Sequence, residues 1–266
     1  GQTNVPSGLT NAVAVAGGGY HSLALQSNGM VVAWGYNGDN QLLIPPGLSN
    51  VMAVAAGGRH SLALQSNGTV VAWGDNEFGQ ATVPSGLNNV VAVAGGYYHS
   101  LALQNNGTVV GWGYNGDGET TIPTGMNNVV AISAGYAHNL ALQRNGKVVA
   151  WGANYSGQAT VPLGLSNVMA IAAGGWHSLA LQSNGTVVAW GDNAGGKTTV
   201  PSGLTNVVAI AGGGYHSLAL QRDGTVVAWG DNADGEVTIP PGLSNVVAIA
   251  AGGQHSLAIT PGPAII

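Results

Sequence analysis

Seven histidines are the residues of this chain with the clearest capacity for chemistry. They follow one another at a constant interval of 39 residues: His21, His60, His99, His138, His177, His216 and His255. Imidazole serves as a metal ligand and as a general base. One metal ion needs three or four donors in a single shell, whereas equivalent positions of a repeat are spread apart around a ring. We therefore expect no metal site, no cofactor and no catalytic residue among the histidines.

The composition excludes several other classes of protein. The 266 residues include no cysteine, so disulfides and cysteine zinc sites are ruled out. Five basic residues and a net charge of −5 leave no basic patch for nucleic acid. No apolar run approaches the ~18 residues that a membrane helix needs. We predict neither a nucleic-acid partner nor a membrane partner, and the 45% of apolar residues argues against disorder.

A second residue type keeps the same interval as the histidines. Six tryptophans do so: Trp34, Trp73, Trp112, Trp151, Trp190 and Trp229. A fixed period of this size indicates a solenoid, a propeller or an array. No linker interrupts the repeat, which predicts a single domain over residues 1–266.

Each unit reads as four short strands. In the second unit these are residues 51–56, 60–65, 69–74 and 81–83, separated by Gly, Asn, Pro and Ser. Asn-Gly or Asp-Gly stands between the second and third strands of six units, as at Asn67-Gly68. This dipeptide favours a type I′ turn, because both central residues need positive φ. Every unit is thus expected to contain an antiparallel hairpin.

The apolar runs alternate poorly with polar residues, which is typical of sheets covered on both faces. Propeller blades are packed in this way. The chain begins within a last strand and ends partway through a third, and seven units of 39 residues would make 273, seven more than its length. We predict an all-β, seven-bladed β-propeller with four antiparallel strands per blade. The seventh blade would combine residues 246–266 with the N-terminal strand, residues 1–6. Each histidine would then fix its own blade by hydrogen bonds, as a buried polar group must.

The segments Ala-Gly-Gly-x-His-Ser-Leu-Ala-Leu and Val-Val-Ala-Trp-Gly-x-Asn resemble the repeats of the regulator of chromosome condensation family. That resemblance covers the whole chain and implies a seven-bladed propeller. The chromatin member of the family has longer repeats, exchanges nucleotide on a GTPase and binds nucleosomes. The short unit ending Gly-Gln-x-Thr-Val-Pro is more similar to a secreted bacterial propeller that inhibits β-lactamase through loops on one face. The resemblance implies a protein-binding platform.

Residues that differ between units indicate where function lies. Strand alternation places the first–second and third–fourth connections on one face, which we call the loop face, and the hairpins and linkers on the other. All ten aromatic residues outside the tryptophan repeat fall on the loop face, with nine acids and two bases. Tyr and Trp are typical interface anchors, and an acidic surface attracts a basic partner. The predicted partner-binding residues are Tyr20, Tyr36, Arg59, Glu77, Phe78, Tyr97, Tyr98, Tyr114, Tyr136, Tyr155, Trp176 and Tyr215.

Three functional hypotheses follow from this pattern. The first is a monomeric, non-enzymatic binder of a basic protein, secreted or displayed at the surface of a bacterium, with β-lactamase inhibition as its sharpest version. The second is a lectin, which would reuse one sugar-stacking aromatic per blade; here the residue before each histidine varies instead. The third is an enzyme with its site in the central channel, for which the sequence offers no constellation. Tolerance of substitution in loops is the non-functional alternative.

Overall fold

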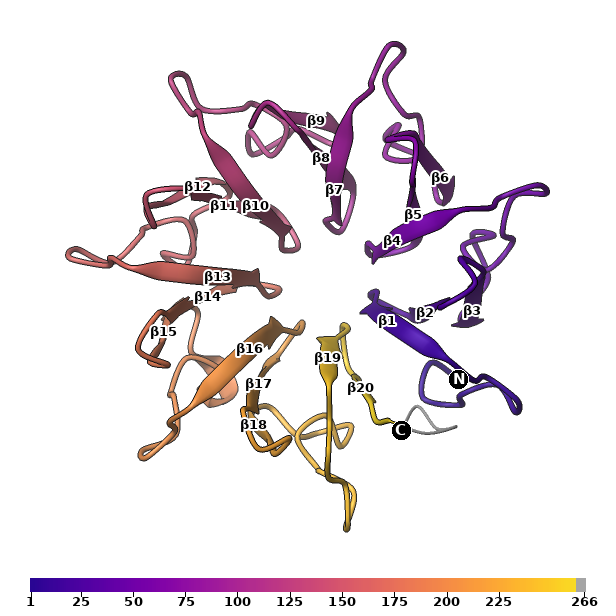
Figure 1. Ribbon diagram of the computed structural model, residues 1–266. Helices are drawn as coiled ribbons and strands as arrows, with labels where there is room; N and C mark the ends of the chain where they lie inside the picture. Colours follow the sequence, from indigo (N-terminus) through magenta and orange to yellow (C-terminus); the bar gives the residue numbers. More distant parts are fainter. Residues whose placement is uncertain (262–266) are drawn as a thin grey trace.

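The computed structural model describes residues 1–261, and nearly all of their regular structure is β-strand. Seven antiparallel sheets stand around a central axis (Figure 1), six with three strands and one with two. The one helix among the described residues is the short turn η1 (Ala194–Gly196). It follows that no helix in this part of the chain is long and apolar enough to cross a membrane.

Each unit contributes an inner, a middle and, in six units, an outer strand, in chain order. The inner strands are β1 (Ala12–Gly17), β4 (Val51–Ala56), β7 (Val90–Gly95), β10 (Val129–Ala134), β13 (Val168–Ala173), β16 (Val207–Gly212) and β19 (Ala248–Ala251). The middle strands are β2 (His21–Gln26), β5 (His60–Gln65), β8 (His99–Gln104), β11 (His138–Gln143), β14 (His177–Gln182), β17 (His216–Gln221) and β20 (Ser256–Ile259). The outer strands are β3 (Val31–Gly35), β6 (Val70–Gly74), β9 (Val109–Gly113), β12 (Val148–Gly152), β15 (Val187–Gly191) and β18 (Val226–Gly230).

The hairpins between middle and outer strands are confirmed, but their predicted turn type is wrong. In the first sheet the Gln26 N–H donates to the Met30 carbonyl at 2.9 Å, which closes a loop of three residues. Gly29 has a φ of 78°, whereas Asn28 is not left-handed. A three-residue loop ending in a left-handed glycine is a type I turn with a bulge. The asparagine acts through its side chain instead, because Asn28 Oδ1 accepts the Met30 N–H at 3.0 Å.

The predicted fourth strand is wrong as well. Residues 81–83 form a turn and irregular chain, and none of the seven sheets contains them. Their backbone N–H groups bond locally: Asn76 Oδ1 accepts from Ala81 at 2.9 Å, and the Gly79 carbonyl accepts from Thr82 at 2.9 Å. Pro84, which follows, has no N–H to donate. The asparagine that recurs at this position therefore has a structural role, because it shapes the connection. Few backbone N–H groups of residues 81–83 are left to pair with a neighbouring strand.

The N-terminal segment takes the place of such a connection and forms no strand, contrary to the prediction. The Gln2 carbonyl accepts from Ser22 Oγ at 3.0 Å and from Trp34 Nε1 at 2.8 Å. In the second unit the Gln41 carbonyl receives the same pair of bonds. Residues 1–6 thus pack on the first sheet, at its border with the last one. The predicted third strand of the seventh blade, at 264–266, lies outside the described residues.

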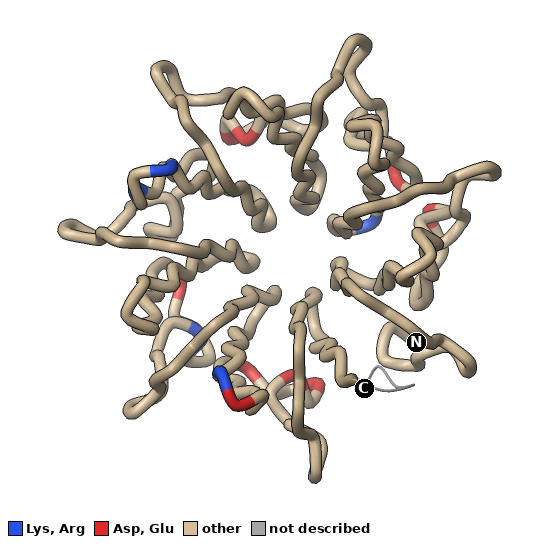
Figure 2. Tube along the Cα trace, viewed as in Figure 1, with Lys and Arg blue, Asp and Glu red and all other residues tan. Residues whose placement is uncertain are grey.

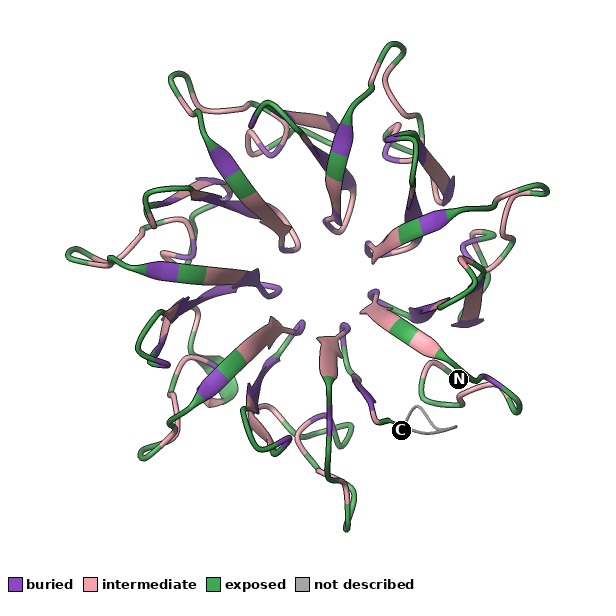
Figure 3. Cartoon of the chain, in the orientation of Figure 1, coloured by how far each residue is buried: buried purple, intermediate pink, exposed green. Residues whose placement is uncertain are grey.

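The core consists of contacts between neighbouring sheets. Side chains of the middle strand point alternately to its two neighbours, and both directions are buried. Leu23 and Leu25 pack against the next sheet, in contact with Ala63 and Trp73, while Ala24 packs in a cluster with Leu257 of the last sheet. Leucines of one middle strand thus pack against an alanine and a tryptophan of the next sheet. Burial on both faces, shown in Figure 3, is the reason for the nearly continuous apolar runs.

Candidate functional site

The repeated histidines join neighbouring sheets, so the prediction that each fixes its own blade is wrong. His21 Nε2 lies 2.9 Å from Ser61 Oγ of the next unit. The single hydroxyl proton of Ser61 is donated to the Gln41 carbonyl at 3.0 Å. The hydroxyl must therefore accept from the histidine, which fixes the imidazole as the Nε2–H tautomer. Because the bond is buried and crosses an interface, it sets how two sheets pack.

Asn139, which replaces serine in the fourth unit, preserves this arrangement. Its Oδ1 accepts from His99 Nε2 at 2.7 Å, and its Nδ2 donates to the Glu119 carbonyl at 2.8 Å. One amide thus reproduces both roles of the hydroxyl. The last bond, between His255 Nε2 and Ser22 Oγ at 2.9 Å, joins the seventh sheet to the first and completes the ring.

These histidines are held in the neutral form. Burial, and then the neighbouring His99 and His21, lowers the pKa of His60 to about 3. Burial likewise lowers the pKa of His21 to about 4. Each ring serves its own interface, and no group of three residues suited to hold a metal ion occurs within residues 1–261.

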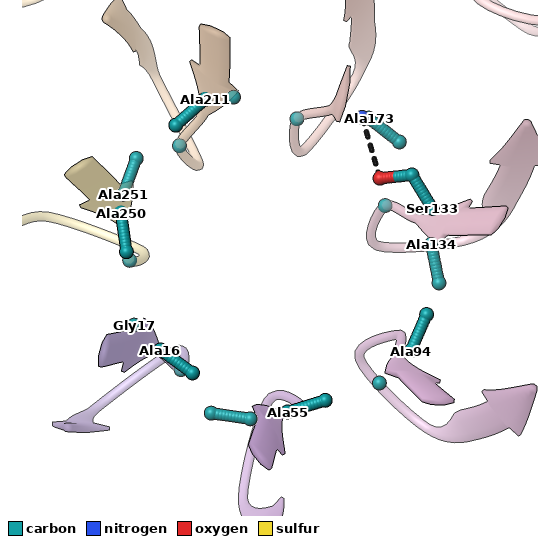
Figure 4. A pocket seen from close by; sticks show the side chains of 18 of the residues that line it. Ala16, Gly17, Ala55, Ala94, Ser133, Ala134, Ala173, Ala211, Ala250 and Ala251 are labelled. Atoms are coloured by element: carbon teal, nitrogen blue, oxygen red, sulfur yellow. Dashed lines mark hydrogen bonds between the residues drawn. The ribbon is translucent and has the colours of Figure 1, made fainter. Parts of the chain in front are cut away.

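The central channel offers little reactive chemistry. Its hollow of about 320 Å³ is lined mainly by alanine, glycine, valine and isoleucine, and all seven inner strands contribute to it. Figure 4 shows the ring of alanines, including Ala55, Ala94 and Ala211, around this space. Ser133 Oγ, the hydroxyl on the inner strands here, accepts the Ala173 N–H at 2.9 Å. Only Tyr97 and Tyr136, at one mouth of the channel, add further polar side chains to the lining.

The loop-face aromatics form one connected cluster, with a single exception. Edge-to-face contacts join Phe78 to Tyr98 and Tyr114 at centroid distances of 5.0 and 5.1 Å. Tyr97 contacts Tyr98 at 4.6 Å and Tyr136 at 5.0 Å. Three further pairs extend the cluster: Tyr136–Trp176, Tyr136–Tyr215 and Tyr20–Tyr36. The Tyr97 hydroxyl, 3.4 Å from that of Tyr20, links the last pair to the rest. Nine predicted residues are thus brought together from six units.

Two substitutions of glycine by tyrosine shape the centre of this cluster. Tyr97 and Tyr136 occupy a position that is glycine in the other five units. The ring of Tyr136 lies across Gly175 and Gly214, where an added Cβ would collide with Tyr136 Cε2 and Oη. Backbone bonds between adjacent units encircle the same mouth, such as Gly253 N–H to the Gly18 carbonyl at 2.9 Å. Bare glycine backbone in the neighbouring units is what lets the rings lie over the channel mouth.

A hollow of about 470 Å³ opens among these rings above the channel. It is lined by Gly19, Tyr20, Tyr97, Tyr98, Tyr136, Ala137, Trp176, Tyr215, Gly253 and Gln254. Sequence reasoning selected aromatic residues and therefore missed Ala137 and Gln254. Both precede a repeated histidine, as do Tyr20, Tyr98, Trp176 and Tyr215. Selection by repeat position would have found them.

The remaining predicted residues lie outside the hollow. The guanidinium of Arg59 lies 5.5 Å from the Tyr20 centroid and 6.0 Å from that of Tyr36. It also pairs with Asp39 at 3.6 Å. Glu77 is exposed in a third–fourth connection. Tyr155 is the exception to the cluster: its ring is 77% exposed and its hydroxyl bonds to Asp117.

The loop face is acidic, although fewer charges reach its surface than expected. The side chains of Glu119, Glu236 and Lys197 are buried. Lys197 Nζ bonds to Asp192 at 2.6 Å and to the Ala194 carbonyl at 2.8 Å. Of the predicted nine acids and two bases, seven carboxylates and the guanidinium of Arg59 remain accessible. Figure 2 shows the charges on the connections and none along the inner strands.

Seven antiparallel sheets set radially around a channel define a protein of the β-propeller class. The regulator of chromosome condensation (RCC1) repeat matches residues 12–41, 52–80, 90–119, 129–158, 169–196 and 207–236. These stretches cover more than half of the chain, which belongs to this repeat family. Among curated protein sequences, none gives a match.

Solved structures are similar over almost the whole chain. Prp20p from Saccharomyces cerevisiae has a TM-score of 0.80 and 23% identity, over 93% of this chain and 82% of that one. Human WBSCR16 has a TM-score of 0.79 and 24% identity, over 95% and 88%. The ectodomain of the receptor kinase ACR4 from Arabidopsis thaliana has a TM-score of 0.75 and 23% identity, over 97% and 98%. At these identities the similarity shows the fold alone.

Proposed function

We propose that this chain is a non-enzymatic, seven-bladed RCC1-type propeller that binds a protein partner through its loop face. The observation that carries this proposal is the connected cluster of nine aromatic side chains around one hollow at the channel mouth. Aromatic residues of this kind supply the central anchors of protein interfaces. These side chains are partly exposed on an otherwise glycine-rich surface, and a bound partner would bury their remaining apolar area.

Charge indicates the chemistry of the partner. The accessible carboxylates outnumber the accessible bases on the loop face, which attracts a basic protein and speeds its association. Among structures with the same fold, that of Prp20p was described with its binding to Gsp1p and histones, and yeast RCC1 was solved bound to Kap60. These neighbours support a protein-binding role and leave the partner of this chain to be identified.

A capture experiment tests the loop face. The immobilised chain would be compared with Tyr98→Ala, Trp176→Ala and Tyr215→Ala variants in a native extract. We expect each to lose most of the partner, since interface anchors contribute about 2 kcal/mol or more. Met169→Ala is the matched control, because Met169 is 56% exposed at the opposite end of β13 from Trp176. Equal capture by all variants would remove the loop face from the interface.

Finer versions of this function stay predictions. Inhibition of a β-lactamase, a monomeric state and secretion by a bacterium rest on the sequence and have no support in the comparisons. Mixing the chain with a β-lactamase and following residual hydrolysis addresses the first of these. A lectin role is not supported either, because no single aromatic residue recurs before the histidine in every unit.

A further inference from the structure

The hollow at the channel mouth has the features of a site for a single cation. Its ten lining residues include five tyrosines and one tryptophan and carry no charged side chain. Several of the rings stand nearly perpendicular to one another: Tyr136 meets Trp176 at 87° and Tyr215 at 82°. Ring faces attract cations through their quadrupole, and perpendicular rings let several faces border one space.

A guanidinium of the chain itself already uses this surface. Arg59 lies against Tyr20 and Tyr36, and Tyr20 also lines the hollow. Asp39 holds Arg59 at the rim, so its charge is neutralised locally. The rings beyond Tyr20 have no such cation within the described residues. The hollow therefore repeats, on a larger scale, an environment that stabilises a guanidinium in the same protein.

Hydrogen-bond acceptors distinguish a guanidinium from other cations here. The Gln254 amide donates through Nε2 to Asp234 at 2.6 Å, which orients the amide and assigns Oε1 as its acceptor end. Tyr97, Tyr98 and Tyr215, which also line the hollow, carry hydroxyl oxygens that can accept hydrogen bonds. A planar guanidinium donates five hydrogen bonds while stacking on aromatic faces. A quaternary ammonium could use the rings but not these acceptors.

We propose that the hollow binds one arginine side chain of the basic partner. This proposal rests on the proposed protein-binding function and specifies its anchor. The volume of about 470 Å³ lies within the range of small-molecule sites. Electrostatic attraction would bring the partner to the acidic face, and insertion of the arginine into the hollow would fix its position.

Short peptides test this proposal without the natural partner. The probes are acetyl-Gly-Arg-Gly-amide and matched peptides with citrulline or lysine, followed by the NMR signal of the Trp176 indole. Citrulline keeps the shape of arginine and removes the charge. We expect the arginine peptide to bind at least about tenfold more tightly than the citrulline peptide, in line with cation–π energies. Binding to the Trp176→Ala and Tyr136→Phe variants is followed by the NMR signals of other residues that line the hollow, because Trp176→Ala removes the indole. The first should abolish binding, and the second keeps the ring and should weaken it only slightly.

The outcomes separate the two proposals. Equal binding of arginine and citrulline peptides, or binding that survives Trp176→Ala, would overturn the arginine site. A response to N-acetylglucosamine or cellobiose instead of arginine would also overturn it and assign the hollow to sugars. If Trp176→Ala abolishes capture of the partner while no arginine peptide binds, the loop-face function stands and the arginine anchor fails. Met169→Ala should leave peptide binding unchanged.

Discussion

The repeated histidines and the residues that they bond in the neighbouring sheets form what we call the framework. The framework is uniform from unit to unit, whereas the loop face varies, although the same repeat builds both. In the framework, each of seven interfaces carries the same histidine bond, and the one exception in sequence, Asn139, makes the same contacts as serine. On the loop face, the residue before each histidine differs, as in Tyr20, Ala137 and Gln254. Uniform positions join the sheets. Unequal positions break the ring symmetry and leave a single hollow at the channel mouth.

The two regions also differ in how polar groups are treated. Framework hydrogen bonds cross buried interfaces, and the Gln80 carbonyl accepts from both Ser100 and Trp112. Some buried framework atoms, such as His21 Nδ1 and Gln80 Nε2, have no hydrogen-bond partner among the described residues. The cost of losing one partner there is high, because a buried group is left unsatisfied. Loop-face rings contact one another and solvent. Their loss should cost less stability and more binding.

Acid should destroy the framework, and this is the largest effect that we expect. Burial lowers the pKa of the framework histidines to about 3 or 4, from an ordinary value of 6.5. The unfolded chain therefore binds more protons than the folded one, so stability is full above pH 6.5 and falls as pH drops below it. Each histidine contributes about 1.4 kcal/mol per pH unit. Seven together should unfold a domain of ordinary stability near pH 5.

Circular dichroism and tryptophan fluorescence between pH 4 and pH 8 measure this transition. Histidine ring signals in NMR should show no titration between pH 8 and pH 6 in the folded protein. A native spectrum that persists at pH 4 would mean that the rings accept protons without loss of the sheet interfaces.

The framework bond can be broken at one interface by changing Asn139. Asn139→Ala removes the acceptor for His99 and the donor to the Glu119 carbonyl, so two buried groups lose a partner. We expect a loss of about 2–4 kcal/mol in the free energy of unfolding. Asn139→Ser restores the arrangement of the other units and should stay within about 1 kcal/mol of the parent. Urea denaturation measures both, and a serine variant as unstable as the alanine variant would argue against equivalent hydrogen-bond roles.

The sequence alone predicted the repeat, the radial sheets and the residues of the aromatic cluster, because each depends on periodicity or on strand alternation. It did not predict which residue accepts the hydrogen bond of each histidine. His21 and Ser22 are adjacent in the chain, yet His21 pairs with Ser61 of the next unit, and only the packing of sheets determines this. The prediction of a fourth strand was wrong for a related reason. The apolar pattern of residues 81–83 is compatible with a strand, but Asn76 bonds its backbone instead.

Loop-face aromatics should affect stability less than the framework does. Trp176 and Tyr215 each contact Tyr136 at the edge of the cluster, at 6.3 and 6.4 Å. Trp176→Ala or Tyr215→Ala should lower the free energy of unfolding by about 1 kcal/mol or less, as for most partly exposed side chains. Thermal unfolding of the capture variants provides the measurement. A loss as large as that of Asn139→Ala would show that the cluster belongs to the framework.

The smallest expected effect comes from Glu119→Gln, which replaces a charged residue by the uncharged residue found at this position in other units. Glu119 occupies a position that is glutamine at Gln41, Gln80 and Gln158, and its Oε2 accepts the Asp117 N–H at 2.9 Å. Burial, with Asp117 nearby, raises the pKa of Glu119 above its ordinary value. The folded state therefore holds the proton more tightly than the unfolded chain, and stability falls as pH rises through the folded pKa. Glu119→Gln keeps the acceptor and removes the charge, so it should raise Tm by about 1–2 °C at pH 7.

The gain is limited because glutamine brings an amide group that the framework does not fully satisfy. Gln80 Nε2 is buried with no hydrogen-bond partner among the described residues, and the new amide would share that cost. The difference between Glu119→Gln and the parent should shrink as pH falls toward the range where Glu119 is protonated in both states. Differential scanning calorimetry at pH 7 and pH 6, above the expected acid transition, tests the trend. A difference that grows on acidification would contradict a buried carboxylate as its cause.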